Sequence, residues 1–141
     1  MKPIAFWDAS VLVTLCVNQA PTPQALVFVD KYRLAVWWAT HVEIVSALTQ
    51  LLRRNEITSD KFAQAKMQAD GLAILWSVIA PSAKIGFEAR ALLERYPLRA
   101  ADALQLAAAL EWCEGKPTGN VFLTFDKRLR EAAGLAGFTL E

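Results

Sequence analysis

The sequence predicts a three-layer α/β/α sandwich in a single domain, residues 1–141, with a central parallel sheet. Short apolar runs alternate with longer helical stretches along the whole chain. Strands separated by helices form parallel sheets that are covered on both faces. The chain has 141 residues, 55% of them hydrophobic, which suits one ordinary domain with a packed core. The chain contains no internal repeat and no low-complexity linker.

The first elements follow from two apolar runs. Residues 4–7 read IAFW, a buried strand that ends at the carboxylate of Asp8, and residues 10–17 continue as an apolar helix. Pro21 and Pro23 mark a loop. Residues 24–31 then predict a short helix, and residues 34–38, apolar throughout, predict the second strand.

Helix-start signals define the next two elements. Thr40 and Glu43 fit a capping box, in which the two side chains satisfy each other's backbone amides, so we expect a helix over residues 40–54. Thr58 and Ser59 provide the cap of a further helix, which we expect to end near Gly71.

Proline and glycine divide the second half of the chain. We expect a third strand over residues 73–80, a helix over 82–96, and an alanine-rich helix over 98–113. A turn at 115–120 leads to a fourth strand, 121–124. Asp126 begins a last helix that should end near Gly134, and residues 138–140 predict a short fifth strand.

Composition excludes several classes of function. The net charge of +1 gives no overall basic signature for nucleic acid. His41 is the only histidine, which excludes histidine-rich zinc sites and leaves no credible Ser-His-Asp triad. Neither a dinucleotide-binding GxGxxG nor a P-loop is present.

We expect a cytoplasmic protein without a membrane segment or an export signal. No apolar run reaches the roughly 20 residues that a membrane helix needs, and Asp8 interrupts the N-terminal apolar stretch. Cys16 and Cys113 lie in apolar helical contexts without metal-ligand spacing, so we interpret them as reduced thiols. The five tryptophans lie in apolar runs and should serve core or interface packing rather than base stacking.

Four acidic residues stand apart from the solvated majority. Asp8 follows the first strand, and Glu43 lies in the first turn of the helix after the second strand. Asp102 lies in the first turn of the alanine-rich helix, and Asp126 follows the fourth strand. Because the carboxyl ends of parallel strands meet at one edge of a sheet, we expect these acids to gather there.

Each acid taken singly also has a structural explanation. Asp8 and Asp126 could cap helices, Glu43 belongs to the expected capping box, and Asp102 could favour the positive end of its helix. Four carboxylates in one cleft, however, would repel each other. A divalent cation relieves that repulsion, and an all-oxygen ligand set favours Mg²⁺ or Mn²⁺. Such an ion can activate water and hold phosphate oxygens.

These four segments resemble, in order, the motifs of the PIN-domain family, and within it the VapC-type toxins of toxin–antitoxin pairs. The segments are WDASVLV, THVEIVSAL, LRAADALQLAAAL and VFLTFDKRLREAA. The resemblance covers nearly the whole chain. It implies a Mg²⁺- or Mn²⁺-dependent endoribonuclease in which water attacks an RNA phosphodiester. It also implies a homodimer and a VapB-type antitoxin that covers the site.

The resemblance assigns roles to individual residues. The metal site, which is also the catalytic site, would consist of Asp8, Glu43, Asp102 and Asp126. Asp8 and Asp102 would be the first candidates for direct ligands. Glu43 and Asp126 would complete the site, directly or through water. Ser10 and Thr124 would orient carboxylates by hydrogen bonding. The candidates for phosphate binding are Arg99, Lys127 and Arg128.

Two positions depart from the family pattern. Many relatives carry histidine where this chain has Gln105. Because this position is not one of the four acids, we expect the difference to affect substrate recognition rather than metal binding. Some relatives also carry an extra acid beside the fourth aspartate, where this chain has Lys127.

Three alternatives stand beside the toxin. The chain could be a PIN-domain nuclease of RNA processing outside a toxin–antitoxin pair, or a catalytically inactive PIN-like binding module. A phospho-acceptor receiver domain is disfavoured. That fold needs paired acids after its first strand and an acceptor aspartate after its third, whereas Asp8 stands alone and the third strand ends in Ala80-Pro81.

Overall fold

The computed structural model describes residues 1–141, and its centre is a four-stranded sheet in the order β3-β2-β1-β4. Every neighbouring pair of strands is parallel, with Ile4 of β1 opposite Arg33 of β2 and Phe6 opposite Phe122 of β4. This confirms the predicted central parallel sheet. The strands are β1 Ile4–Trp7, β2 Arg33–Trp37, β3 Ser77–Ile79 and β4 Phe122–Leu123.

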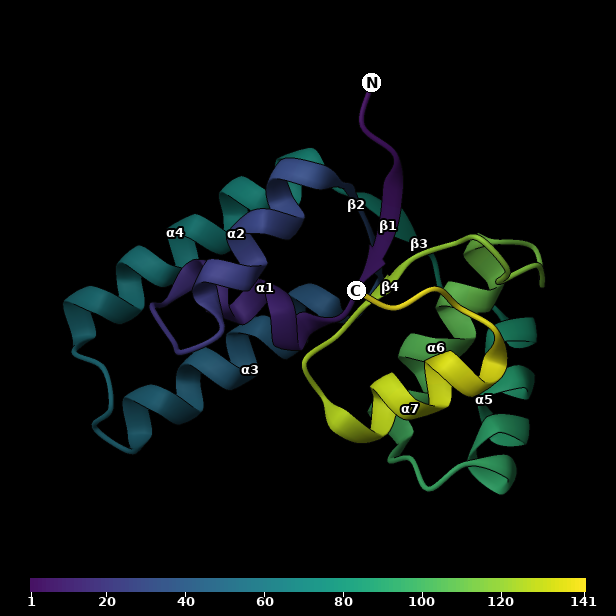
Figure 1. Ribbon diagram of the computed structural model, residues 1–141. Helices are drawn as coiled ribbons and strands as arrows, with labels where there is room; N and C mark the ends of the chain where they lie inside the picture. The colour runs from purple at the N-terminus through teal and green to yellow at the C-terminus, as the bar shows by residue number, and fades with distance from the viewer.

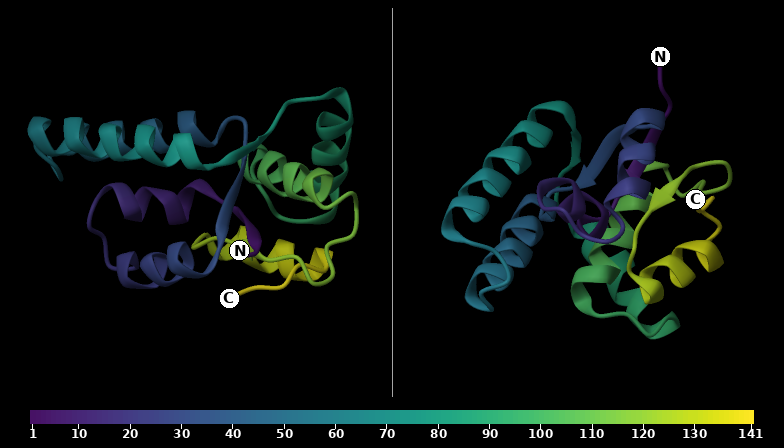
Figure 2. Two further views of the ribbon diagram at one scale, coloured as in Figure 1. Left: turned by 90° about the horizontal axis from the view of Figure 1, so that it is seen from above. Right: turned by 60° about the vertical axis from the view of Figure 1, so that its left-hand side comes forward.

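Seven helices cover the two faces of the sheet, which confirms the three-layer architecture. Helices α1 to α4 lie on one side of the strands, and α5 to α7 lie on the other (Figures 1 and 2). The helices are α1 Ala9–Cys16, α2 Thr22–Lys31, α3 Thr40–Arg53, α4 Ser59–Leu75, α5 Ala83–Arg95, α6 Ala100–Trp112 and α7 Lys127–Ala136.

Alternate residues of the strands point into two separate cores. Trp7 of β1 packs with residues of α1 to α4, whereas its neighbour Phe6 packs with residues of α5 to α7. Both side chains are fully buried. This alternation follows from the two-residue period of a strand, and it explains why all central strands are apolar on both faces.

Two predicted boundaries around the third strand are wrong. Helix α4 does not end near Gly71 but continues to Leu75, and β3 is therefore limited to Ser77–Ile79 rather than 73–80. The buried faces of Ala65 and Ala69 hold α4 against the first core. Helical glycine costs only about 1 kcal/mol relative to alanine, so one glycine does not stop a packed helix.

The predicted capping box of α3 is also wrong. Ala39 occupies the N-cap position, and no side chain caps the helix. Thr40 lies inside the helix with its hydroxyl fully buried, and Glu43 turns toward α6 instead. Thr58, in contrast, caps α4 as expected, because its hydroxyl accepts a hydrogen bond from the amide of Lys61.

The C-terminal region differs in detail from the prediction. Helix α7 passes Gly134 and ends at Ala136, where Gly137 adopts a positive φ of 114° that favours glycine. In place of a fifth strand there is a single parallel bridge between Val121 and Thr139.

The structure agrees with the prediction of free thiols and of core packing for two of the tryptophans. Cys16 and Cys113 are both free cysteines. Trp7 and Trp37 are buried in the core, and Trp38 is 58% exposed, so that interface packing remains the prediction for it. No helix combines the length and the apolar character needed to cross a bilayer.

Candidate active site

Asp8 occupies the carboxyl end of the central strand β1 and does not cap the helix that follows. It stands at the N-cap position of α1, but its side chain accepts no capping hydrogen bond. Instead, its Oδ2 atom accepts hydrogen bonds from Ser10 Oγ at 2.6 Å and from Thr124 Oγ1 at 2.8 Å. The residue is 4% exposed. Two hydroxyl donors therefore satisfy this buried carboxylate, and its side chain is not used for helix capping.

Backbone amides fix the direction of both hydroxyls. Ser10 Oγ accepts a hydrogen bond from the amide of Phe125 at 2.9 Å, and Thr124 Oγ1 accepts one from the amide of Asp126 at 3.0 Å. Each hydroxyl therefore accepts from the chain after β4 and donates to Asp8. This network joins the ends of β1 and β4, which are adjacent in the sheet.

Glu43 reaches the same region from α3, which follows β2. Burial raises the pKa of its carboxyl to about 7, and repulsion from Asp8 and Asp102 acts in the same direction. The amide of Gln105, whose Nε2 lies 3.3 Å from Glu43 Oε2, opposes this increase. A carboxylate with a pKa near neutrality is typical of functional sites.

Asp102 comes from the first turn of α6, which packs against the second core. Burial raises the pKa of this carboxyl, and repulsion from Asp126 and Asp8 raises it further. Burial likewise raises the pKa of Asp8, with Asp126 contributing repulsion, although Ser10 and Thr124 stabilise its charge. These mutual repulsions show that acids from four segments of the chain gather in one region.

Asp126 has the structural role that its position suggested. Its Oδ1 accepts a hydrogen bond of 2.8 Å from the amide of Leu129, which makes it the N-cap of α7. One carboxylate oxygen is thus engaged by the helix, while the charge of the same group raises the pKa of Asp8 and of Asp102. The capping and electrostatic roles therefore coexist in this residue.

The donor set of the site consists of carboxylate oxygens, with hydroxyls behind them. As they lie, no three acidic, histidine or cysteine side chains converge closely enough to hold a metal ion together. An ion held here would take one or two of these carboxylates directly and complete its shell with water, as Mg²⁺ commonly does. Several carboxylates with raised pKa values in one region fit a divalent cation, because a cation relieves their repulsion.

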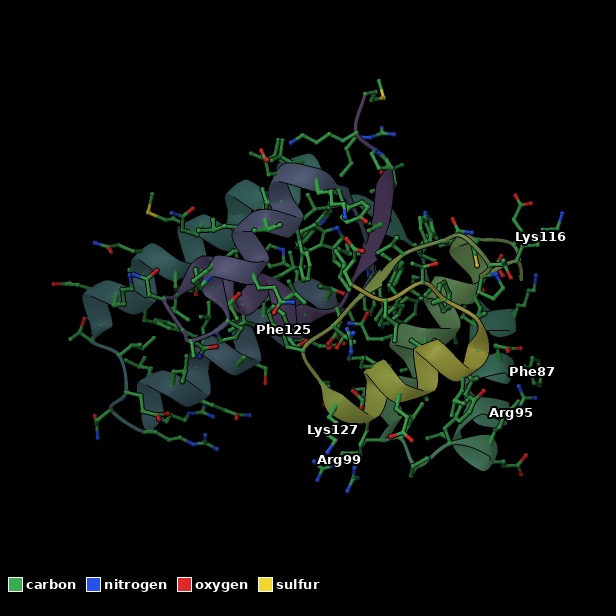
Figure 3. The ribbon with its side chains drawn as sticks, viewed as in Figure 1. Phe87, Arg95, Arg99, Lys116, Phe125 and Lys127 are labelled. Carbon is green, nitrogen blue, oxygen red and sulfur yellow. The ribbon has the colours of Figure 1, made fainter.

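The three basic candidates lie at the starts of α6 and α7, and the charge of Arg99 lowers the pKa of Asp102, against the increase caused by burial. Arg99 is the N-cap residue of α6, and Lys127 begins α7. Figure 3 shows the side chains of Arg99 and Lys127 projecting from the same side of the molecule. Both residues and Arg128 are exposed, and none of them forms an ion pair. They are therefore free to meet an anionic ligand.

One side chain that contacts an acid, and the hydroxyl behind it, are not predicted as site residues from the sequence. Gln105 donates to Glu43 and to Thr40, whereas the sequence marks Gln105 only as a departure from the family pattern and Thr40 only as a helix cap. Both are fully buried, and Gln105 Nε2 lies 3.2 Å from Thr40 Oγ1. The signal that could have found Gln105 is a long polar side chain within a run of alanine and leucine.

A comparison with protein families decides the classification. The sequence pattern of the PIN domain matches residues 5–135 of the chain. The chain belongs to the PIN-domain family. Its relatives include ribonuclease VapC45 and ribonuclease VapC49, from two strains of Mycobacterium tuberculosis. Each is 29% identical over 139 residues, covering 96% of this chain and 92% of the relative.

Solved structures share the PIN fold. VapC20 of M. tuberculosis, described as a sarcin-ricin loop cleaving toxin, superposes with a TM-score of 0.67 and 16% identity over 96% of both chains. PAE2754 of Pyrobaculum aerophilum has the same TM-score and 22% identity, over 99% of this chain and 90% of the other. VapBC2 of Rickettsia felis, bound to a promoter DNA fragment, gives a TM-score of 0.66 and 13% identity, over 98% and 97%.

Proposed function

We propose that this PIN-domain protein is a Mg²⁺- or Mn²⁺-dependent endoribonuclease and the toxin of a VapBC-type pair. The observation that carries the proposal is the environment of Asp8. A buried carboxylate receives two hydroxyl hydrogen bonds and lies within electrostatic reach of Asp126. The names of the related ribonucleases VapC45 and VapC49 support the same activity.

In this proposal each acid holds the ion or the water around it. Asp8 and Asp102 are the direct ligands, and Glu43 and Asp126 complete the site directly or through water. When bound, the divalent ion supplies an activated water and charge stabilisation at the phosphate. Ser10 and Thr124 hold one oxygen of Asp8, so the carboxylate is oriented before the ion arrives.

The exposed cations beside the acids are proposed to bind the RNA backbone. Arg99, Lys127 and Arg128 lack carboxylate partners, so no intramolecular ion pair has to break before they contact phosphate. Contacts of this kind position the substrate without reading its sequence.

An antitoxin is the proposed protein partner. Structures that share this fold include a toxin–antitoxin complex from Klebsiella pneumoniae, with a TM-score of 0.61, 20% identity and 88% coverage of both chains. A VapB-type segment laid over the acids would block access of RNA. Induction of this protein alone should then arrest bacterial growth, and co-expression of its cognate antitoxin should restore growth. Growth arrest that persists in the Asp8→Asn variant would contradict a nuclease-based toxicity.

A homodimer is the further proposed assembly, and the open edge of the sheet supports it. Strand β3 is an edge strand, and large apolar side chains are exposed at or beside it: Trp38, Val42, Ile74, Leu75 and Val78. Such surfaces are typical of protein interfaces. Light scattering should show a dimer that the Ile74→Glu variant converts to a monomer.

Cleavage of RNA by the purified protein tests the enzymatic proposal. Cleavage should require Mg²⁺ or Mn²⁺, stop with EDTA, and be absent in Asp8→Asn. The same activity in Asp8→Asn would point to a contaminating nuclease. A protein that binds the ion but cleaves none of the messenger, transfer or ribosomal RNAs offered would contradict the proposed activity.

A further inference from the structure

We propose that Gln105 is a positioning residue that fixes the Glu43 carboxylate and thereby joins the acids of α3 and α6 into one site. This inference rests on the proposed function, because it assigns a task toward the same divalent ion. Gln105 itself would touch neither the ion nor the RNA.

The burial of Gln105 requires an explanation. The side chain is fully buried in a segment that reads ALQLAAAL, where an aliphatic residue would fill the space without polar atoms. A buried amide is unfavourable unless its donors and acceptor are satisfied. A glutamine at this position therefore points to partners that need it.

The partners all lie on the nitrogen side of the amide. Nε2 of Gln105 lies 3.2 Å from Thr40 Oγ1, and it lies 3.4 and 3.3 Å from the two carboxylate oxygens of Glu43. An amide nitrogen has two hydrogens. One hydrogen meets the buried hydroxyl of Thr40, and the other is shared by the two oxygens of Glu43.

The oxygen side of the same amide is unsatisfied. Gln105 Oε1 is buried and has no hydrogen-bond partner. Rotating the amide by half a turn would place this oxygen against the acceptor oxygens of the Glu43 carboxylate. The observed orientation leaves the carbonyl oxygen unpaired but lets the amide nitrogen donate to Glu43. This is the orientation expected if Gln105 serves as a hydrogen-bond donor.

The contact between Gln105 and Glu43 links the two helices that carry Glu43 and Asp102. Thr40 and Glu43 are three residues apart on α3, and Asp102 and Gln105 are three residues apart on α6, so each pair shares one face of its helix. The contacts of Gln105 are the only hydrogen bonds between these two helices. Gln105 therefore sets the position of Glu43 relative to the helix that carries Asp102.

The first test observes the contact directly, without metal or RNA. In the metal-free protein, nuclear magnetic resonance should show two widely separated side-chain amide protons for Gln105. In Glu43→Ala one of these protons should move upfield while the one facing Thr40 stays. If neither proton moves in this variant, the proposed contact does not exist in solution and the proposal is overturned.

The second test separates positioning from packing. Gln105→Met keeps the size of the side chain but removes both donors, so Mn²⁺ affinity measured by calorimetry should fall roughly tenfold or more while the melting temperature is kept. Gln105→His restores a donor and should recover most of the affinity. Gln50→Met is the matched control, because Gln50 is exposed on α3 and makes no side-chain hydrogen bond.

The outcomes distinguish this proposal from the proposed function. Unchanged Mn²⁺ affinity in a folded Gln105→Met protein would overturn the positioning role and leave the nuclease proposal intact. Failure of the unaltered protein to bind Mn²⁺ would instead overturn the proposed function. The resonance measurement on the metal-free protein would then decide on its own whether Gln105 holds Glu43.

Discussion

The hydroxyl of Thr124 donates a hydrogen bond of 2.8 Å to Oδ2 of Asp8, a residue 116 positions earlier in the chain. The same hydroxyl accepts a hydrogen bond from the backbone amide of Asp126 at 3.0 Å. This relationship connects the carboxyl ends of two adjacent strands and orients the most deeply buried acid of the site. This part of the site thus lies just beyond the carboxyl ends of β1 and β4.

Removing the Thr124 hydroxyl should impair catalysis more than folding. Thr124→Val keeps the shape of the side chain but leaves Asp8 with Ser10 as its only hydroxyl donor. Loss of a residue that orients a metal ligand typically lowers metal affinity or activity by about 10–100-fold. We therefore expect initial cleavage rates to fall by about that factor. Thr124→Ser, which keeps the hydroxyl, is the control. Equal rates for Thr124→Val and the unaltered protein would show that Asp8 needs no such support.

Two variants should separate the capping role of Asp126 from the role of its charge. Asparagine is as good a helix cap as aspartate, so Asp126→Asn should keep the hydrogen bond to the Leu129 amide and leave stability nearly unchanged. Asp126→Ala should lose about 1 kcal/mol of unfolding free energy in urea titrations. Both variants should lose RNA cleavage, because both lack the charge. Full activity in Asp126→Asn would mean that this residue is only a cap.

The stability of the metal-free protein should fall as pH rises. The folded-state pKa of Glu43, about 7, lies above its ordinary value of 4.5, so the folded state binds more protons than the unfolded chain between these two values. Stability should therefore decrease from pH 4.5 to 7 and then level off. Burial also raises the pKa of Asp8 and of Asp102, which adds to the same trend.

Neutralising Glu43 tests this assignment. Glu43→Gln should raise stability at pH 8 by about 1–2 kcal/mol, a figure that allows for solvent screening of a half-buried group. The variant should also have a flatter melting-temperature profile between pH 5 and 8. Asp60→Asn on the exposed start of α4 is the control and should leave the profile as it is. A profile for Glu43→Gln as steep as that of the unaltered protein would contradict the raised pKa.

Arg99 and Lys127 should contribute to substrate binding rather than to the chemical step. Alanine at either position should raise KM for RNA several-fold with little change in kcat, and should reduce the salt dependence of binding by about one unit of slope. Lys66→Ala, on α4, removes a comparable charge from a helix on the opposite side of the sheet. A similar effect of Lys66→Ala would indicate binding by overall charge instead of this site.

The sequence predicts the layers of this fold because each apolar run is short and bounded by glycine, proline or an acid. Boundaries are less predictable where packing overrides local signals. Helix α4 passes Gly71 because Ala65 and Ala69 bury one face of it against the first core, and no local pattern reports that contact. The shortened strand β3 follows directly from this extension.

The candidate site shows the same limit. Its four acids could be identified from their positions at strand ends and helix starts, since parallel topology brings such positions together. Their partners could not all be identified. Thr40 and Glu43 match a capping box three residues apart, yet both turn to Gln105, which is more than 60 positions away in sequence. Long-range contacts of this kind depend on how α6 packs beside α3, which the local sequence pattern does not specify.

A calorimetric titration with Mn²⁺ tests most directly the claim that these acids form one divalent-cation site. The unaltered protein should bind the ion, and Asp8→Asn and Asp102→Asn should each bind it at least roughly tenfold more weakly. Asp60→Asn should bind as the unaltered protein does. Absence of binding by the unaltered protein, or equal binding by Asp8→Asn, would contradict the account.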